Sequence, residues 1–349
     1  MENNKLSMAR GMSRNLQFVR FVAASLVIMS HSFVLSTGNF EKEWFYKYSN
    51  GQITMGAFAV GIFFLYSGFL TAKSLQKNPT MKEYVVGRCV RIFPLLIITV
   101  LLSMFVLGPI MTEYSIKEYF FDSRLYKYFL NSCFILQHDL PKVFSNNIYD
   151  STINGALWTL PVEFLCYIIC YIALKINLLK PKKILITFPL VVGGSVVICI
   201  VSRLLDVEIL TTVLFPVLCF YVGVVYYVFR EYIVMNVGFF LVSFFMFLVM
   251  SYIGYLKLGF ILFFCYCLIY FAFGCRDLFK HIWKCGNWSY AMYLCGFPVQ
   301  QALVDLYGGK MNSYVNIIIS FPIIIFMSIG LYYLIEKRVT NFYKEKGRA

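Results

Sequence analysis

Long apolar runs, separated by short polar stretches, recur from one end of the chain to the other. A helix needs about 20 consecutive apolar residues to cross a bilayer. Ten runs close to that length lie at 17–36, 53–75, 88–110, 153–175, 184–202, 209–229, 235–254, 258–274, 289–307 and 314–335. The pattern predicts an all-α fold: a polytopic membrane helix bundle of about ten transmembrane helices.

Composition agrees with this fold class. Of 349 residues, 60% are hydrophobic, 19% aromatic and 14% charged, outside the usual range of a soluble globular domain. We find no internal repeat and no low-complexity linker, so the chain is expected to form a single membrane domain over 1–349 with no fused soluble domain. The largest stretch between runs, 111–152, mixes aromatic and charged residues, which is typical of a segment that lies on a membrane face.

The distribution of basic residues predicts the orientation. If both termini are cytoplasmic, 22 of the 31 Lys and Arg residues fall on the cytoplasmic side. This bias accounts for the net charge of +14, so we read no nucleic-acid binding into it and expect membrane lipid as the surrounding partner. A cleaved signal peptide is the alternative reading of residues 14–36, but the run is long and lacks a clear cleavage site.

The eleven cysteines lie mostly in or beside the apolar runs. That distribution predicts no disulfide framework and no metal site, with the thiols packing as small hydrophobic groups.

A first polar cluster lies in the first run, where Arg20 precedes His31 and Ser32. Eleven positions are about three helical turns, so Arg20 and His31 share a face about 16 Å apart along the axis. An imidazole of near-neutral pKa suits a general base in acyl transfer. The alternative is an interfacial histidine bonded to backbone and an arginine that extends to lipid phosphates.

A second cluster is GIFFLYSGFL at 61–70, which contains Ser67 and Gly68. Small residues allow helix backbones to approach closely in lipid, so packing alone accounts for the motif. The alternatives are a direct catalytic role for Ser67 and a narrow substrate passage lined by this helix.

Arg88 and Arg91 form a third cluster, three residues apart at the start of the third run and followed by Pro94, where a helix can kink. Two guanidinium groups on one face match phosphate oxygens. The sequence leaves two readings open: a site for a phosphorylated cytosolic cosubstrate, or an anchor to lipid headgroups.

The fourth cluster is LWTLPVEF at 157–164, which places Glu163 inside the fourth run. A carboxylate in the membrane needs a partner. We expect it to orient a histidine ring nitrogen or to pair with an arginine from another span.

Taken in order, these motifs resemble acyltransferase family 3, the membrane proteins that O-acylate bacterial surface carbohydrates. The resemblance is carried by Arg20 with His31, by Gly61, Phe63, Phe64, Ser67, Gly68 and Phe69, by Arg88 with Arg91, by Trp158 through Glu163, by WSYAMYLCGFPVQQ at 288–301 and by LIEKR at 334–338.

The resemblance implies transfer of an acyl group, most often acetyl, from cytosolic acyl-CoA to a sugar hydroxyl. The acceptor would be a cell-surface or lipid-linked glycan (O-antigen, lipopolysaccharide, capsule or exopolysaccharide), and the location the bacterial inner membrane. Acetyl-CoA would be a cosubstrate and no cofactor would be tightly bound. The catalytic group would comprise His31 as general base, Ser32 and Glu163, and the donor site would comprise Arg20, Arg88, Arg91, Ser67 and Gly68.

The chain departs from the family pattern in two ways. Many relatives carry a second histidine where this chain has Gly296 or Phe297. Other relatives carry a fused extracytoplasmic domain, so here acceptor binding would fall to the membrane domain, its outer loops or a separate protein. His138 and His281 are expected to be solvated loop residues.

A secondary transporter or a flippase for lipid-linked sugars is the alternative function, since buried Arg, His and Glu can also relay protons. Transporters commonly show two related halves with paired broken helices. Here the polar clusters concentrate in the first four runs, which favours the enzyme.

Overall fold

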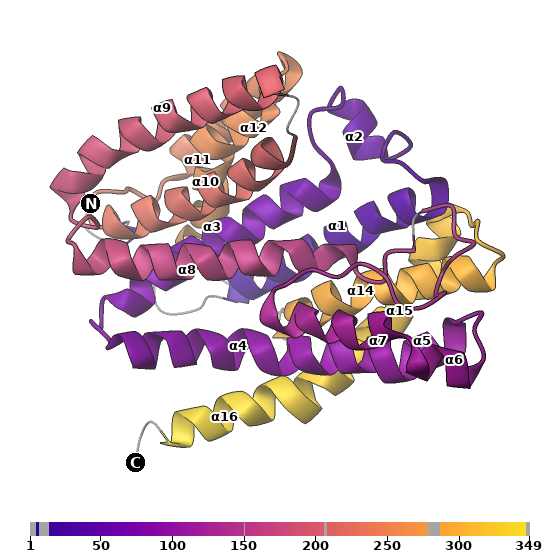
Figure 1. The fold of residues 1–349 in the computed structure, drawn as a ribbon. Coiled ribbons are helices and arrows are strands. Elements are labelled where there is room, and N and C mark those ends of the chain that lie inside the picture. Colours follow the sequence, from indigo (N-terminus) through magenta and orange to yellow (C-terminus); the bar gives the residue numbers. More distant parts are fainter. Residues whose placement is uncertain are drawn as a thin grey trace. The chain divides into compact units, whose positions relative to one another are not determined.

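The computed structural model describes residues 5–6, 14–149, 151–205, 208–276, 278 and 287–346. The regular elements of these residues are helices, as predicted, and their only strand-like pairings are two isolated bridges, Lys5 with Val234 and Thr112 with Val143. The chain divides into two compact units, each built from three separate segments. Figure 1 shows the helices coloured along the sequence.

Each of the ten expected spans coincides with a helix or with consecutive helical segments. Among the described residues, seven stretches are long and apolar enough to cross a membrane, namely Arg14–Thr37, Met55–Leu75, Met81–Met111, Gly155–Lys175, Pro181–Ser202, Leu256–Gly274 and Ser313–Tyr343. The chain is therefore a multi-pass membrane protein. The count of ten and the cytoplasmic side of the termini stay predictions.

Unit 1 comprises Met1–Arg20, Ala57–Tyr84 and Val162–Trp283. Its helices are most of α3 (Met55–Leu75) and α8 (Thr159–Lys175), then α9 (Pro181–Leu205), α10 (Glu208–Val228), α11 (Val237–Tyr252), α12 (Leu256–Gly259), η6 (Phe260–Phe264), α13 (Cys265–Ile269) and η7 (Tyr270–Gly274). Large apolar side chains of α9 and α11 are exposed, among them Leu190, Leu204 and Phe245. Such exposure suits a surface that faces lipid.

Glycines bring α3 and α10 together inside unit 1. A Cβ atom added at Gly68 would overlap the carbonyl oxygen of Phe220, and one added at Gly223 would overlap the carbonyl oxygen of Leu65. The two backbones are thus in direct contact, which is how small residues drive helix association in lipid.

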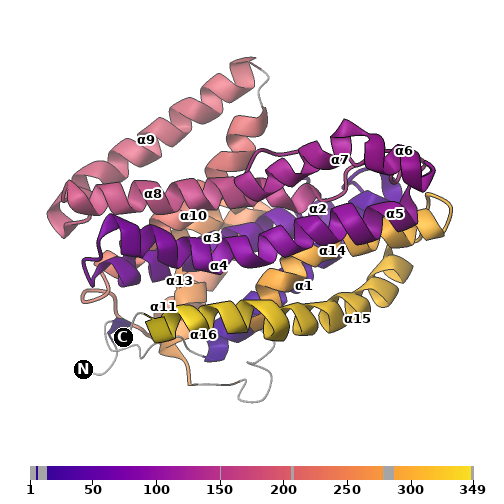
Figure 2. The same ribbon diagram turned by 60° about the horizontal axis from the view of Figure 1, so that its bottom comes forward.

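Unit 2 comprises Phe21–Gly56, Val85–Pro161 and Lys284–Ala349. It contains most of α1 (Arg14–Thr37), α2 (Trp44–Tyr48), most of α4 (Met81–Leu102), η3 (Ser103–Leu107), α5 (Gly108–Met111), α6 (Ile116–Phe121), α7 (Ser123–Tyr128), η4 (Phe129–Cys133), η5 (Gly155–Trp158), α14 (Ser289–Leu306), α15 (Ser313–Leu331), η9 (Tyr332–Glu336) and α16 (Lys337–Lys346). Figure 2 shows α15 continuing into α16 as one long rod.

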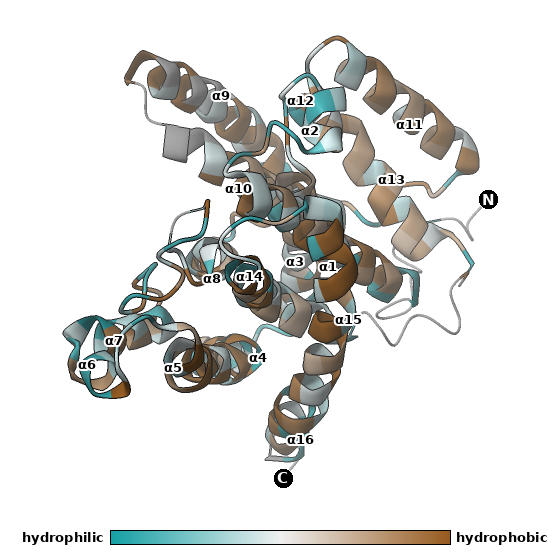
Figure 3. Ribbon diagram, turned by 90° about the vertical axis from the view of Figure 1, so that its right-hand side faces the viewer, coloured by the Kyte–Doolittle hydropathy of each residue, from teal (hydrophilic) through white to brown (hydrophobic). Residues whose placement is uncertain are grey.

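The segment between α5 and η5 is folded by its own polar side chains. Ser115 and Glu118 form a capping box at the start of α6, and Asp122 caps α7 by accepting a hydrogen bond from the Arg124 amide. Asn131 then holds residue 137 through two hydrogen bonds of 3.0 Å. The α6–α7 region carries hydrophilic residues, coloured teal in Figure 3.

Candidate active site

His31 lies on α1 with its imidazole half-buried against Phe297 of α14. The two ring centroids are 5.1 Å apart and the planes meet at 73°, an edge-to-face arrangement that aromatic rings favour. Within the described part of the chain, neither ring nitrogen of His31 makes a hydrogen bond with a protein group. The ring is thus held by packing, and its role as a general base stays a prediction.

Ser32 is fully buried in a hydrogen-bond network that joins three helices. Its hydroxyl donates to Asn316 Oδ1 on α15 at 2.9 Å and accepts from Gln300 Nε2 on α14 at 2.5 Å. Gln300 Nε2 also donates to the Ile28 carbonyl of α1 at 2.8 Å. This network joins α1 to α14 and α15 next to His31, and membership of Ser32 in the catalytic group stays a prediction.

Glu43 is a second buried polar group in unit 2, in the loop that follows α1. Its carboxylate accepts a hydrogen bond from Ser30 Oγ at 2.6 Å and another from the amide of Met55 at the start of α3. Burial raises the pKa of the Glu43 carboxyl above its ordinary value, and the two hydrogen bonds act in the opposite direction. Glu43 therefore connects α1 to the first residue of α3.

Phe297 connects His31 to the segment that precedes η5. The ring of Tyr149 lies 6.1 Å from that of Phe297, and a Cβ atom at Gly155 would come within 2.8 Å of the Phe297 ring. Gly155 is thus the residue that lets this segment approach α14.

In unit 1, Glu163 of α8 meets Ser67 of α3. The Glu163 Oε1 atom accepts hydrogen bonds from Ser67 Oγ and from Tyr167 Oη, each at 2.5 Å, and the two hydroxyl oxygens are 2.8 Å apart. Ser67 and Tyr167 are buried, whereas Glu163 is half-buried. This compact constellation can hold or move a proton among three oxygen atoms. A pairing of Glu163 with His31 or with an arginine stays a prediction.

The three arginines of the expected donor site lie on helices, as the sequence predicts. Arg20 and His31 share α1, which runs unbroken from Arg14 to Thr37. Arg88 and Arg91 lie one turn apart on α4, both half-buried and both engaged in interactions within the protein. The helix continues through Pro94 rather than ending there.

The structure thus brings Ser67 and Glu163 together, but the expected site residues divide between the units. Arg20, Ser67, Gly68 and Glu163 lie in unit 1, and His31, Ser32, Arg88 and Arg91 lie in unit 2. Gly68 faces α10, which agrees with the packing interpretation of its motif. His138 is exposed, as predicted, and His281 lies outside the described residues.

Sequence reasoning missed Tyr167, Glu43, Gln300 and Asn316. Tyr167 follows Glu163 by four residues, a spacing that places both on one helix face and offered a usable signal. Glu43 offered none, because nothing in the local sequence separates it from the exposed Glu41.

Comparison with known proteins agrees with these motifs. The family model described as an acyltransferase domain, acyltransferase family 3, matches residues 13–337. A protein named O-acetyl transferase from Shigella phage Sf6 is 32% identical over 326 residues, which cover 91% of this chain and 93% of that protein. No solved structure matches the chain.

The long apolar helices define the class as a multi-pass membrane protein. The chain belongs to acyltransferase family 3. The predicted family and the predicted enzyme class, an O-acetyltransferase, are both confirmed, and membership does not favour the transporter alternative.

Proposed function

We propose that the protein transfers an acetyl group from cytosolic acetyl-CoA to a hydroxyl of a cell-surface or lipid-linked glycan, and that it does so in the bacterial inner membrane with both termini in the cytoplasm. The glycan classes are those with free sugar hydroxyls, such as O-antigen, lipopolysaccharide, capsule or exopolysaccharide. Family membership supports acyl transfer, and the basic residues that the sequence concentrates on one side support the orientation.

In the proposed reaction His31 is the general base. Its neutral ring takes the proton from the sugar hydroxyl while the hydroxyl oxygen attacks the thioester carbonyl carbon. A carbon–oxygen bond forms, the carbon–sulfur bond breaks, and the proton passes from the imidazolium to the departing thiolate. The products are the acetylated glycan and free coenzyme A, and His31 returns to its neutral form.

Other residues bind the donor or orient the base. Arg88 and Arg91 bind donor phosphates through their forked guanidinium groups, and Arg20 supplies a further anionic contact. Ser67 lies along the path of the pantetheine arm, where Glu163 and Tyr167 orient its hydroxyl. Ser32 positions His31 by fixing α1 to α14 and α15.

The observation that carries the proposal is the environment of His31. It is a half-buried imidazole in a spanning helix, held by the Phe297 ring, with both nitrogens unbonded among the described residues. A structural histidine in an apolar environment would normally have a hydrogen-bond partner, because an unsatisfied buried polar group costs free energy.

The test is mass spectrometry of surface glycans from cells with the gene, without it, and with His31→Gln. We expect the deletion and His31→Gln to remove the mass of an acetyl ester while the variant stays in the membrane at normal abundance. His138→Gln is the control, since it changes an exposed histidine of the same chain, and it should acetylate normally.

Two results would contradict different parts of the proposal, namely the general base and the acceptor. Normal acetylation by His31→Gln would exclude His31 as the base. Glycans of identical mass with and without the gene would exclude the glycan acceptor.

A further inference from the structure

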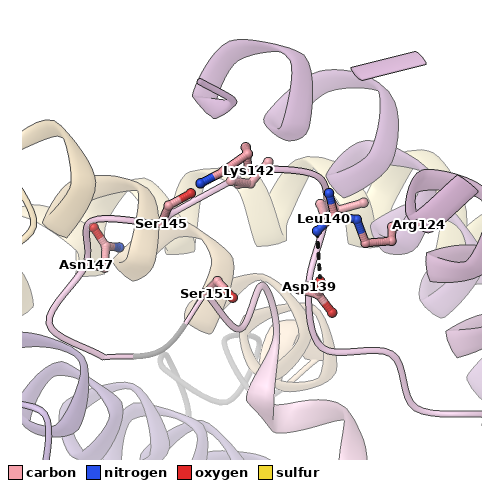
Figure 4. Close-up of a pocket in the computed structure, with 8 residues that line it drawn as sticks. Arg124, Asp139, Leu140, Lys142, Ser145, Asn147 and Ser151 are labelled. Carbon is pink, nitrogen blue, oxygen red and sulfur yellow. Dashed lines mark ion pairs between the residues drawn. The ribbon is translucent and has the colours of Figure 1, made fainter. Parts of the chain in front are cut away.

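The segment between α5 and η5 encloses a polar cavity in unit 2. Its volume is about 310 Å³, and its polar lining comes from Arg124, Asp139, Lys142, Ser145, Asn147 and Ser151 (Figure 4). Small-molecule sites usually have volumes of about 300–1,000 Å³, so this cavity suits one small group. The proposed catalytic residues do not line it.

Charge balance in the cavity favours a neutral ligand. The Arg124 guanidinium pairs with Asp122 at 2.7 Å and lies 3.9 Å from Asp139, as the dashed line in Figure 4 marks. Lys142 adds one positive charge. The cavity therefore offers both hydrogen-bond donors and acceptors, and among the described lining residues it has no cluster of cations without acidic partners. A phosphate group would require such a cluster, whereas sugar hydroxyls bind well to mixed donors and acceptors.

Asn147 supplies an unsatisfied acceptor in the lining. Its amide nitrogen donates to Gln301 Oε1 on α14 at 2.9 Å, while its Oδ1 atom is buried without a hydrogen-bond partner among the described residues. An unpaired buried carbonyl costs free energy, which a ligand hydroxyl would recover once the Asn147 amide turns to expose this oxygen to the cavity.

The stretch that lines the cavity also contacts the neighbour of His31. Between Asn147 and Ser151, the ring of Tyr149 lies 6.1 Å from that of Phe297, whose ring lies 5.1 Å from that of His31. The amide of residue 148 donates to the carbonyl oxygen of Gly309 at 2.9 Å, which holds the same stretch beyond the end of α14. The cavity lining and His31 thus belong to one unit and are linked through Tyr149 and Phe297.

We infer that this cavity binds a neutral sugar unit of the acceptor glycan next to the unit that is acetylated. The inference rests on the proposed function. It assigns acceptor recognition to the α5–η5 segment of this chain.

The experiment uses the purified full-length protein in lipid nanodiscs with labelled acetyl-CoA. The acceptor probe is the unacetylated glycan fraction extracted from cells that lack the gene, supplied over a range of concentrations. The variants are Lys142→Met and Asp139→Asn in the cavity, with Lys117→Met as the control on exposed α6. Ser145→Trp fills the cavity as a steric test.

Lys142→Met and Asp139→Asn should each raise the KM for the glycan about tenfold, while kcat and the KM for acetyl-CoA stay within about twofold. Lys117→Met should match the wild type, and Ser145→Trp should abolish transfer to the glycan while the binding of acetyl-CoA stays unchanged. The inference would be overturned if the KM for the glycan were unchanged in both cavity variants, or if the KM values for the glycan and for acetyl-CoA rose equally. Failure of the wild type to label any glycan would instead reject the proposed function.

Discussion

The imidazole of His31 packs edge-on against the ring of Phe297, with 5.1 Å between ring centroids. This contact joins α1 to α14 and sets the direction of the proposed base. An aromatic ring supplies shape and packing here without a second titratable group.

Phe297→Leu should therefore lower kcat about tenfold with little change in the KM for acetyl-CoA, because a misplaced base costs transition-state stabilisation rather than donor binding. Steady-state kinetics of the purified protein measure this. Phe321→Leu is the matched control, since Phe321 of α15 also packs a ring against α1, on Phe21 at 6.5 Å. Equal losses in both variants would assign the effect to helix packing alone.

The hydrogen bonds that Ser67 and Tyr167 donate to Glu163 lead to a separate prediction. Tyr167→Phe removes one of the two hydrogen bonds to Glu163 Oε1, and Glu163→Gln removes the charge that both hydroxyls bind. We expect Glu163→Gln to reduce kcat/KM about a hundredfold and Tyr167→Phe about tenfold. Tyr171→Phe, one turn along α8 with a weak 3.4 Å contact to the Pro79 carbonyl, should change little. Wild-type kinetics in Glu163→Gln would remove this cluster from the site.

The contact between α3 and α10 predicts that a methyl group added at Gly68 lowers the stability of the protein. Gly68→Ala should destabilise the protein by about 1–3 kcal/mol, because the added Cβ overlaps backbone that cannot rotate away. Gly330→Ala on α15 is the control, with no atom within 4 Å of its Cβ position. Thermal unfolding in detergent compares the two. A normal midpoint with a raised KM for acetyl-CoA in Gly68→Ala would show instead that Gly68 contacts the donor.

Glu43 predicts a pH-dependent stability. Because burial raises its folded-state pKa above the unfolded value, the stability it contributes is present below the unfolded pKa and is lost as pH rises through the folded one. The unfolding midpoint of the wild type should fall relative to that of Glu43→Gln as the pH rises above the ordinary pKa of a glutamate carboxyl. Glu41→Gln, an exposed neighbour, should leave the pH profile unchanged. Parallel profiles for wild type and Glu43→Gln would contradict the assignment.

If Arg88 and Arg91 bind the donor, changing them should weaken the binding of acetyl-CoA and leave the binding of the glycan unchanged. Arg88→Lys and Arg91→Lys keep the charge but remove the forked geometry, so each should raise the KM for acetyl-CoA about tenfold without changing the KM for the glycan. Arg338→Lys, exposed on α16, provides the control. An unchanged acetyl-CoA KM in both variants would favour the lipid-anchor reading of the pair.

The sequence by itself determined the class of fold and the family. Apolar runs of bilayer length dictate helices, because backbone polar groups in lipid must be satisfied within each segment. Ordered motifs such as Arg20 with His31 and Arg88 with Arg91 were enough to predict the family, since they depend on spacing along single helices.

Only the tertiary structure decided which polar groups meet. Ser67 and Glu163 are 96 residues apart, and Ser32 and Asn316 are 284 apart, so no local pattern could pair them. The same holds for Glu43, whose sequence context resembles that of the exposed Glu41, and for Gly68, whose contact lies on a helix formed much later in the chain. Hydropathy reports whether a segment enters the membrane, whereas the rotation and neighbours of each helix depend on packing between segments far apart in sequence.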